Sequence, residues 1–207
     1  MFKSLAPFFF LLVVFSPLFG QGDSHKKLIV IDAGHGGEDI GAEVKGLKEK
    51  ALALQTATLL KQQLHAKGHR VILTRSRDIF LPLTKRSAIA NETKSALFVS
   101  IHFNAYKSPT PHGIEIFYCN RGSKARQAAS KRLADLILHN MVDATGANSR
   151  GVKTGNFHVI RETRMPAVLI EGGFMTNPSE FICLSNPLYV EKMAHSIALG
   201  IEQFLKK

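Results

Sequence analysis

Residues 28–37, Leu-Ile-Val-Ile-Asp-Ala-Gly-His-Gly-Gly, decide the fold of this chain. The apolar, β-branched run predicts a buried strand, and the glycines that follow it predict a turn. From Leu47 to Leu64 apolar residues recur every three or four positions, and Lys67-Gly68 ends the pattern, so we expect a helix there. A second strand is expected over residues 70–74. Strand and helix therefore alternate from the start.

The alternation continues along the rest of the chain. We expect a short helix over 83–91, strands over 96–101 and 114–118, a long helix over 124–141, a loop through 155, a strand over 167–170 and a closing helix over 188–205. Such an order predicts an α/β fold: a single domain with an open, mostly parallel sheet and helices on both faces.

Composition limits the class of protein. A chain of 207 residues with 45% hydrophobic content is long enough for one sizeable core. The net charge of +11 favours an anionic partner: nucleic acid, acidic lipid or an acidic cell-wall polymer. The chain has no Trp and three Tyr, so few aromatic side chains could stack on bases. Composition thus weakens the nucleic-acid interpretation.

The N-terminal segment is typical of a secretory signal peptide. Lys3 is followed by the apolar run 7–19, and Gly20 supplies a small residue near the cut. The run is shorter than the roughly 20 residues that cross a bilayer, which argues against a stable membrane anchor. We expect a signal peptide over 1–20, a short linker over 21–27, a domain over 28–207 and a periplasmic or secreted protein.

The two cysteines, Cys119 and Cys183, do not form a CxxC pair. This excludes a disulfide scaffold and a cysteine-based zinc ribbon. Both lie among apolar residues, so we expect buried free thiols, with a bridge as an option in an oxidising compartment. Because no Cys follows the apolar N-terminal run before Cys119, lipid attachment at the cut is also excluded.

Polar residues follow three of the expected strands, at Asp32–His35, at His102–Asn104 and at Glu171. Ligands of open α/β sheets gather beyond the carboxyl ends of the strands, so these residues should converge. His35 and His102, with Glu49 at the start of the first long helix, supply the ligand set of a catalytic zinc site. Glu171 could then take a proton from water and return it to a leaving amine.

Each of these residues also has a simpler interpretation. A His beside a glycine turn is more often hydrogen-bonded than bound to metal, and Glu49 could favour a helix N-terminus. The chain has no HExxH helix that would support zinc directly.

Four segments, in order, resemble a known family. They are Ile29-Val-Ile-Asp-Ala-Gly-His-Gly-Gly, Gly46-Leu-Lys-Glu-Lys, Ser100-Ile-His-Phe-Asn-Ala and Met165-Pro-Ala-Val-Leu-Ile-Glu-Gly-Gly-Phe. The chain from about Leu28 to the closing helix is similar to the zinc-dependent N-acetylmuramoyl-L-alanine amidases of the type-3 class.

The resemblance implies a sheet of about six strands and a bound Zn²⁺. It implies His35, Glu49 and His102 as zinc ligands and Glu171 as the catalytic acid/base. The implied reaction is hydrolysis of the amide between the lactyl group of N-acetylmuramic acid and L-alanine, in peptidoglycan or muropeptides.

The chain departs from the larger members of this class. Those from double-membraned bacteria carry an inserted helix that blocks the zinc, and a wall-targeting domain. Between Tyr118 and Pro166 this sequence has room for one helix and a loop. Only the short linker over 21–27 separates the expected signal from the first strand, and no wall-binding repeat follows Leu205. We therefore expect that no activator protein is required and that the basic surface attracts the wall.

Several other polar residues have weaker patterns. Asn104 could hold the substrate peptide, orient a ligand or cap a turn. Arg161 could pair with a peptide carboxylate. Structural ion pairs near Asp78 are expected for Arg75 and Arg86. Six further histidines have no predicted role. We expect two of them to be solvated, His65 and His69. The other four have no predicted carboxylate partner: His112, His139, His158 and His195.

Two short strings point to another class of enzyme. Ser24-His-Lys-Lys27 and Lys153-Thr-Gly155 resemble parts of penicillin-interacting serine acyltransferases, so a penicillin-sensitive D-alanyl-D-alanine carboxypeptidase activity is an alternative. Ser24 stands in a polar stretch instead of heading a buried helix, which favours chance. A non-catalytic wall-binding module and a nucleic-acid binder are further alternatives; the export signal and the lack of RNA-binding motifs disfavour the latter.

Overall fold

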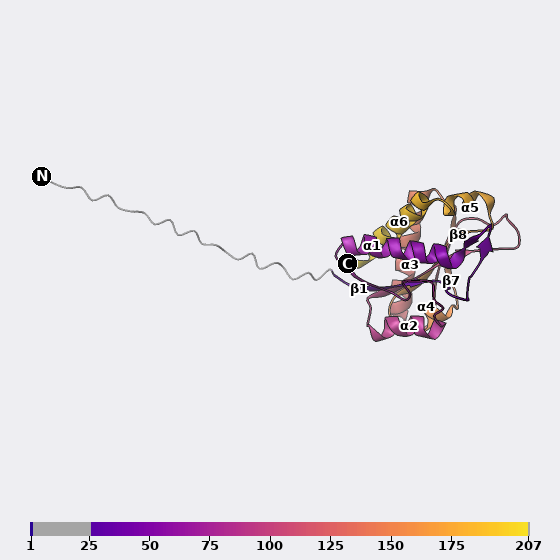
Figure 1. Cartoon of the computed structure of the whole chain (residues 1–207). Helices are drawn as coiled ribbons and strands as arrows, with labels where there is room; N and C mark the ends of the chain where they lie inside the picture. The colour runs from indigo at the N-terminus through magenta and orange to yellow at the C-terminus, as the bar shows by residue number, and fades with distance from the viewer. Residues whose placement is uncertain (2–25, 207) are drawn as a thin grey trace.

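A computed structural model describes Met1 and residues 26–206 (Figure 1). The expected signal peptide, most of the expected linker and Ser24 lie outside the described residues. Among the helices of the described part, none combines the length and the apolar character that a membrane span requires.

Within residues 26–206, the central sheet has six strands in the order β4-β1-β5-β8-β6-β7. All neighbouring pairs are parallel except β6 with β8, which is antiparallel. The expected mostly parallel sheet of about six strands is confirmed. The strands are β1 (Leu28–Ala33), β4 (Arg70–Leu73), β5 (Leu97–Asn104), β6 (Ile114–Tyr118), β7 (Ser149–Thr154) and β8 (Ala167–Phe174), and a separate hairpin pairs β2 (Glu43–Val44) with β3 (Leu47–Lys48).

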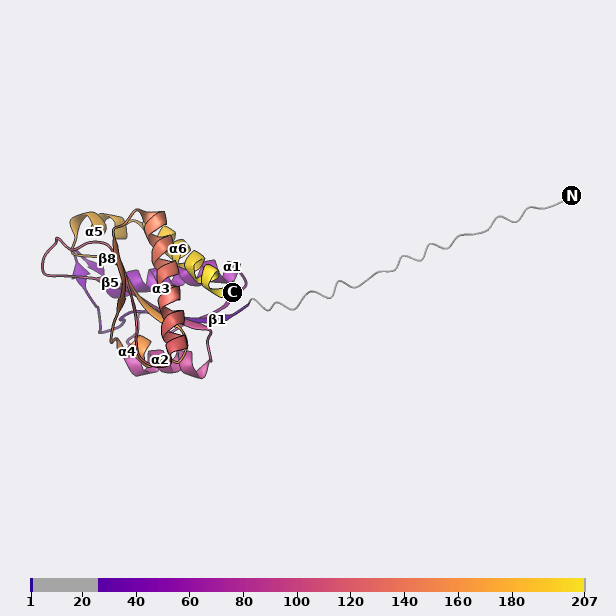
Figure 2. The same ribbon diagram turned by 180° about the vertical axis from the view of Figure 1, so that it is seen from behind.

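Helices cover the sheet unequally. The helices are α1 (Glu49–Ala66), α2 (Leu83–Glu92), α3 (Lys124–Thr145), α4 (His158–Arg161), α5 (Pro178–Leu184) and α6 (Pro187–Leu205). Figures 1 and 2 show α1 and α6 on one side of the sheet and α2 and α4 on the other. The larger apolar core lies under α1, α3 and α6, and the smaller one under the short helices α2 and α4. The second face is therefore thinly covered.

The alternation of side chains along β8 decides which face carries the polar residues. Ile170 belongs to the core under α1, α3 and α6, whereas Ala167 and Leu169 belong to the core under α2 and α4. Glu171 continues the second set, and its register partner on β5 is His102. Both residues thus face the thinly covered side, in the carboxyl-terminal halves of their strands, and β8 runs on to Phe174 instead of ending before Glu171 as expected.

Local signals fix the ends of the long helices. The Ser123 side chain accepts a hydrogen bond from the Arg126 N–H at the start of α3, and Gly146, with a φ of 69°, ends that helix. The Asn186 side chain caps α6, and Pro187 occupies its first turn.

The structure adds elements that the sequence pattern did not predict. Ser149–Thr154, expected as part of a loop, forms β7, and α4, α5 and the β2–β3 hairpin were also not expected. The β7 segment has one large apolar residue, Val152, and lies at the edge of the sheet, where backbone pairing with β6 defines it. The first long helix begins at Glu49, two residues later than expected, because Leu47 and Lys48 pair within the hairpin.

The buried arginines do not form the expected ion pairs near Asp78. Arg86 pairs with the buried Asp32, Nη1 to Oδ1 at 3.0 Å. Arg75 donates to backbone carbonyls, including those of Ala33 and Gly34. Asp78 instead pairs with Lys50, which reaches it from α1 at 2.7 Å. Both arginines tie the turn after β1 to the body of the protein.

Other predictions about single side chains had mixed outcomes. His65 is exposed as expected, but His69 is buried, and its Nε2 lies 2.5 Å from Oε1 of Glu202. The prediction of a solvated His69 is therefore wrong, because a carboxylate distant in sequence meets it from α6. Both cysteines are free thiols as expected; Cys119 is buried, but Cys183 is partly exposed, so the prediction that it is buried is wrong.

Candidate metal centre

Three residues from separate elements meet at the carboxyl edge of the sheet. His35 lies in the turn after β1, Glu49 is the first residue of α1, and His102 is near the end of β5. Glu49 Oε1 lies 2.9 Å from His35 Nε2 and 3.0 Å from His102 Nδ1, and the two ring nitrogens are 3.2 Å apart. The structure thus brings together the side chains for which the sequence predicted a zinc site.

Glycines make this close approach possible. A Cβ on Gly34 would lie 2.3 Å from His102 Cε1, so a side chain there would displace the imidazole. Gly41 has a φ of +65°, and a Cβ on it would lie 2.5 Å from Glu49 Oε2. The conformation of the turn therefore allows the three side chains to point at one another.

The carboxylate of Glu49 is held in its charged form. Burial by itself would raise the pKa of Glu49, but hydrogen bonds from His102 and His35 and their charges hold it well below the usual range. The N–H groups of Phe103 and Ala42 also donate to this carboxylate. A buried negative charge beside two imidazoles is suited to a cation.

The His35 ring is oriented by a second carboxylate. Its Nδ1 lies 2.8 Å from Asp39 Oδ1, which directs Nε2 toward Glu49. Burial lowers the pKa of His35, but hydrogen bonding and the charge of Glu49, with a smaller contribution from Asp39, raise it overall. An imidazole whose second nitrogen is bonded to a carboxylate is typical of metal sites.

Glu171 is a further polar group at this edge. It lies directly opposite His102 in the β5–β8 pair. Its Oε2 is buried and has no hydrogen-bond partner within the described part of the chain. Burial, then the negative charges of Glu49 and Glu115, raises the pKa of Glu171 well above its usual value. An unpartnered carboxyl oxygen on the residue opposite His102 fits a centre that binds a cation, and the donor set of His35, Glu49 and His102 fits zinc.

The two other candidate residues have different surroundings. Asn104 ends β5, and its Nδ2 donates to Glu115 Oε1 at 2.9 Å. Arg161 lies in α4, before the amino end of β8, and bonds to Glu162 and Asn156. The structure therefore brings Asn104 to the sheet edge that carries the site. Arg161 instead bonds to residues of its own segment, Asn156 and Glu162.

The sequence pattern did not predict the charged cluster that begins at the partner of Asn104, Glu115. Glu115 is buried, and Arg150 and Lys153 both pair with it from β7. The one sequence feature that could have indicated this cluster is Glu115 itself, a charged residue inside the otherwise apolar strand Ile114–Tyr118. Lys153 belongs to the Lys-Thr-Gly triplet, and in the structure its Nζ pairs with Glu115 Oε2 at 2.6 Å.

A cavity of about 290 Å³ opens beside the two imidazoles. Phe80 and Leu83, which are 47% and 55% exposed, contribute apolar walls. The side chains of His35 and His102 are 22% and 19% exposed. The cluster is thus reachable from solvent on the thinly covered face of the sheet.

Comparisons with known proteins point to one family. The profile of the family described as N-acetylmuramoyl-L-alanine amidase matches residues 29–203. N-acetylmuramoyl-L-alanine amidase LytC of Bacillus subtilis is 39% identical over 178 residues, which are 86% of this chain and 35% of LytC. The germination-specific N-acetylmuramoyl-L-alanine amidase of the same organism is 31% identical, over 97% of this chain and 92% of the relative. The chain therefore spans about a third of LytC and nearly all of the germination-specific enzyme.

Solved structures show the same fold. The N-acetylmuramoyl-L-alanine amidase from Clostridium difficile 630 has a TM-score of 0.84 and 37% identity, covering 89% of this chain and 99% of that one. The CwlD amidase from Clostridioides difficile, solved in complex with the GerS lipoprotein, has a TM-score of 0.81 and 32% identity, covering 87% of this chain and 98% of that one. The family match over residues 29–203 and these relatives show that this chain belongs to the N-acetylmuramoyl-L-alanine amidase family.

Proposed function

We propose that this protein is a secreted zinc hydrolase that cleaves the amide between the lactyl group of N-acetylmuramic acid and L-alanine of peptidoglycan. The observation that carries the proposal is the cluster of His35, Glu49 and His102 beside the unpartnered carboxyl oxygen of Glu171. Membership of the amidase family supports the choice of substrate. Because all four polar positions are present, a wall-binding module without catalysis is disfavoured.

The three clustered residues would hold the metal. His35 offers Nε2, His102 offers Nδ1 and Glu49 offers a carboxylate oxygen, and the facing ligand atoms all lie within 4.8 Å of one another. Zinc bound there would supply Lewis acidity, which polarises a carbonyl and acidifies water. Asp39 keeps the His35 ring in the orientation that this role needs.

Glu171 moves the proton in the proposed reaction. Its carboxylate accepts a proton from the attacking water as the bond between carbon and the water oxygen forms. It then gives this proton to the amide nitrogen as the carbon–nitrogen bond breaks, so that the products are a carboxylic acid and a free amine. Burial, and then the neighbouring acidic groups, raise the pKa of Glu171 well above its usual value, which strengthens this carboxylate as a proton acceptor.

The location of the protein follows from its N-terminal pattern and its charge. Residues 1–20 act as a cleaved signal peptide, and the mature protein is periplasmic or secreted. With a net charge of +11 for the whole chain, its basic surface attracts acidic wall polymers, with peptidoglycan or muropeptides as the substrate.

Cleavage proceeds without an activator protein. Between β6 and β8 the chain forms α3, β7 and α4. The buried residues of α3, including Leu133, Ile137 and Met141, belong to the core on the face opposite His102. This arrangement gives α3 no position from which to block the cluster. Since the relative CwlD was solved with the lipoprotein GerS, the activity test includes an arm in which a cell extract is added.

Product analysis tests the function directly. The purified protein is incubated with muropeptides after removal of metal and after addition of zinc, and the products are identified by mass. We expect zinc-dependent release of a peptide that begins with L-alanine, at full rate without extract. Cleavage at another bond, or activity that survives without metal, would refute the proposal; dependence on extract would refute the part concerning activation.

A further inference from the structure

Glu115 is the centre of a charged cluster that the proposed chemistry does not use. Its side chain is 7% exposed, and its Oε2 accepts from Arg150 Nε at 2.9 Å and from Lys153 Nζ at 2.6 Å. Its Oε1 accepts from Asn104 Nδ2 at 2.9 Å. The side chains of Arg150 and Lys153 are 32% and 39% exposed. Two cations thus share one buried carboxylate and keep a net positive charge at the surface.

Glu115 and the candidate metal centre lie on the same face of the sheet, in register across three neighbouring strands. Glu171 is the register partner of His102 on β5 and of Glu115 on β6. Residues that lie opposite each other on neighbouring strands point to the same face of a sheet. Arg150 and Lys153 come from β7, the strand beyond β6. With about 5 Å between strands, β7 lies about 10 Å from the strand of Glu171.

An irregularity in β7 places both cations on one side. Ile114 pairs with Ser149, but Ile116 pairs with Val152, so β7 contains one residue more than β6 over this stretch. Side chains three positions apart on a regular strand face opposite sides, whereas the extra residue returns Arg150 to the side of Lys153. Gly151, with a φ of +85°, supplies the conformation that such a bulge requires.

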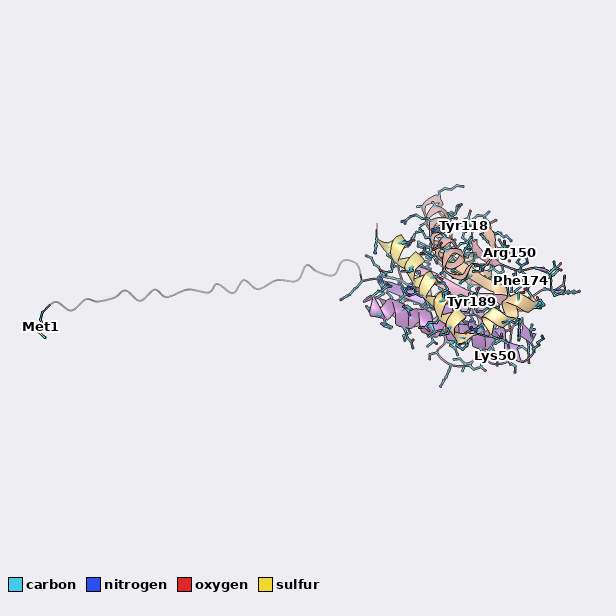
Figure 3. All side chains as sticks on the ribbon, turned by 90° about the horizontal axis from the view of Figure 1, so that it is seen from above. Met1, Lys50, Tyr118, Arg150, Phe174 and Tyr189 are labelled. Atoms are coloured by element: carbon cyan, nitrogen blue, oxygen red, sulfur yellow. The ribbon has the colours of Figure 1, made fainter. Side chains whose placement is uncertain are left out.

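Arg150 and Lys153 are held in place but keep hydrogen-bond donors to spare. The guanidinium carbon of Arg150 lies 4.8 Å from the centre of the Phe174 ring, and Figure 3 labels both residues. Arg150 Nη2 has no hydrogen-bond partner among residues 26–206 in this structure. Lys153 Nζ lies 6.0 Å from the centre of the Phe117 ring and uses one of its three protons on Glu115.

We propose that Arg150 and Lys153 form a subsite for a carboxylate of the substrate peptide, with Glu115 as their positioning residue. The inference rests on the proposed function, because it needs a peptide that extends from the amide beside Glu171. Two to three residues of extended peptide span about 10 Å. The acidic residue that follows L-alanine in a peptidoglycan stem is therefore within reach, and guanidinium and ammonium groups bind carboxylates strongly.

Two matched muropeptides test the subsite. They differ only in the residue after L-alanine, which carries a free carboxylate in one and a carboxamide in the other. We expect the parent protein to bind the carboxylate form with a KM about tenfold lower or more, at similar kcat. Arg150→Gln and Lys153→Gln should each remove most of this preference through KM, whereas Lys153→Arg should keep it. Lys131→Gln, which changes an exposed lysine on α3, is the control and should behave like the parent.

The outcomes separate the subsite from the reaction itself. Equal KM values of the parent for both muropeptides would overturn the subsite and leave the proposed function intact. A preference lost in Arg161→Gln and kept in Arg150→Gln would also overturn it, because recognition would then belong to α4. Failure to cleave either muropeptide would refute the proposed function. If Arg150→Gln does not fold by circular dichroism, the more exposed Lys153→Gln decides the question.

Discussion

Single side chains in this protein are held by partners that are distant in sequence. His35 and His102 are separated by many residues, yet both bond to the Glu49 carboxylate. The convergence of His35, Glu49 and His102 could be predicted because each lies in a short motif near a strand or helix end. The charged cluster around Glu115 could not be predicted. Its ion pair with Arg150 forms only because the sheet places β7 beside β6.

Metal binding should depend on each member of the cluster. We expect His102→Ala to lose most of its bound zinc, because His35 and Glu49 alone make a poor site. Elemental analysis after dialysis measures this, with His65→Ala, an exposed histidine on α1, as the control. Full zinc occupancy in His102→Ala would show that the ligand set is wrong.

Proton transfer should be separable from metal binding. Glu171→Gln keeps the shape of the side chain but removes the group that accepts a proton. We expect unchanged zinc content and a turnover reduced about a hundredfold or more, the usual scale for a general base. If zinc is lost together with activity, Glu171 is a ligand; if turnover is close to that of the parent, it is not the acid/base.

At the scale of elements, the long apolar strands and the periodic helices could be predicted from the sequence. The edge strand β7 could not. Alternating apolar residues predicted β6, whereas β7 depends on backbone pairing with its neighbour. The same edge strand supplies Arg150 and Lys153. The segment with the weakest hydrophobic pattern thus carries charges beside the site.

The ion pairs of Glu115 should make stability depend on pH. Burial would raise the pKa of Glu115, but the hydrogen bonds and charges of Lys153 and Arg150 lower it overall in the folded protein. A lowered pKa contributes stability above the ordinary glutamate pKa and loses it as pH falls through the folded value. We therefore expect Glu115→Gln to destabilise the fold by about 1–3 kcal/mol at neutral pH.

This difference between the parent and Glu115→Gln should shrink in acid. Urea unfolding of both proteins at neutral pH and below about pH 4 measures it. A difference that is constant over this range would mean that the charge of Glu115 contributes nothing to stability. Lys131→Gln serves again as the control, since its partner Asp135 is about half exposed.

At the scale of the whole molecule, the candidate metal centre lies at one end of the sheet and a buried histidine that joins two elements lies at the other. The candidate metal centre lies at the carboxyl ends of β1, β5 and β8, on the face that α2 and α4 leave partly open. Beyond the amino ends of β1 and β4, the backbone N–H of Lys27 donates to His69 Nδ1, and His69 Nε2 bonds to Glu202. This buried histidine joins the first strand to the last helix.

Removing that junction should cost stability without changing the chemistry. We expect His69→Ala to lower the free energy of unfolding by about 1–3 kcal/mol, because Glu202 and the Lys27 N–H lose a buried partner. His69 lies at the opposite end of the strands from the cluster. We therefore expect KM, and kcat calculated from the concentration of folded protein, to equal those of the parent. Urea unfolding and muropeptide kinetics on the same samples measure both quantities, with His65→Ala as the matched control. A change in kcat at full folding would show that the two ends of the sheet are coupled.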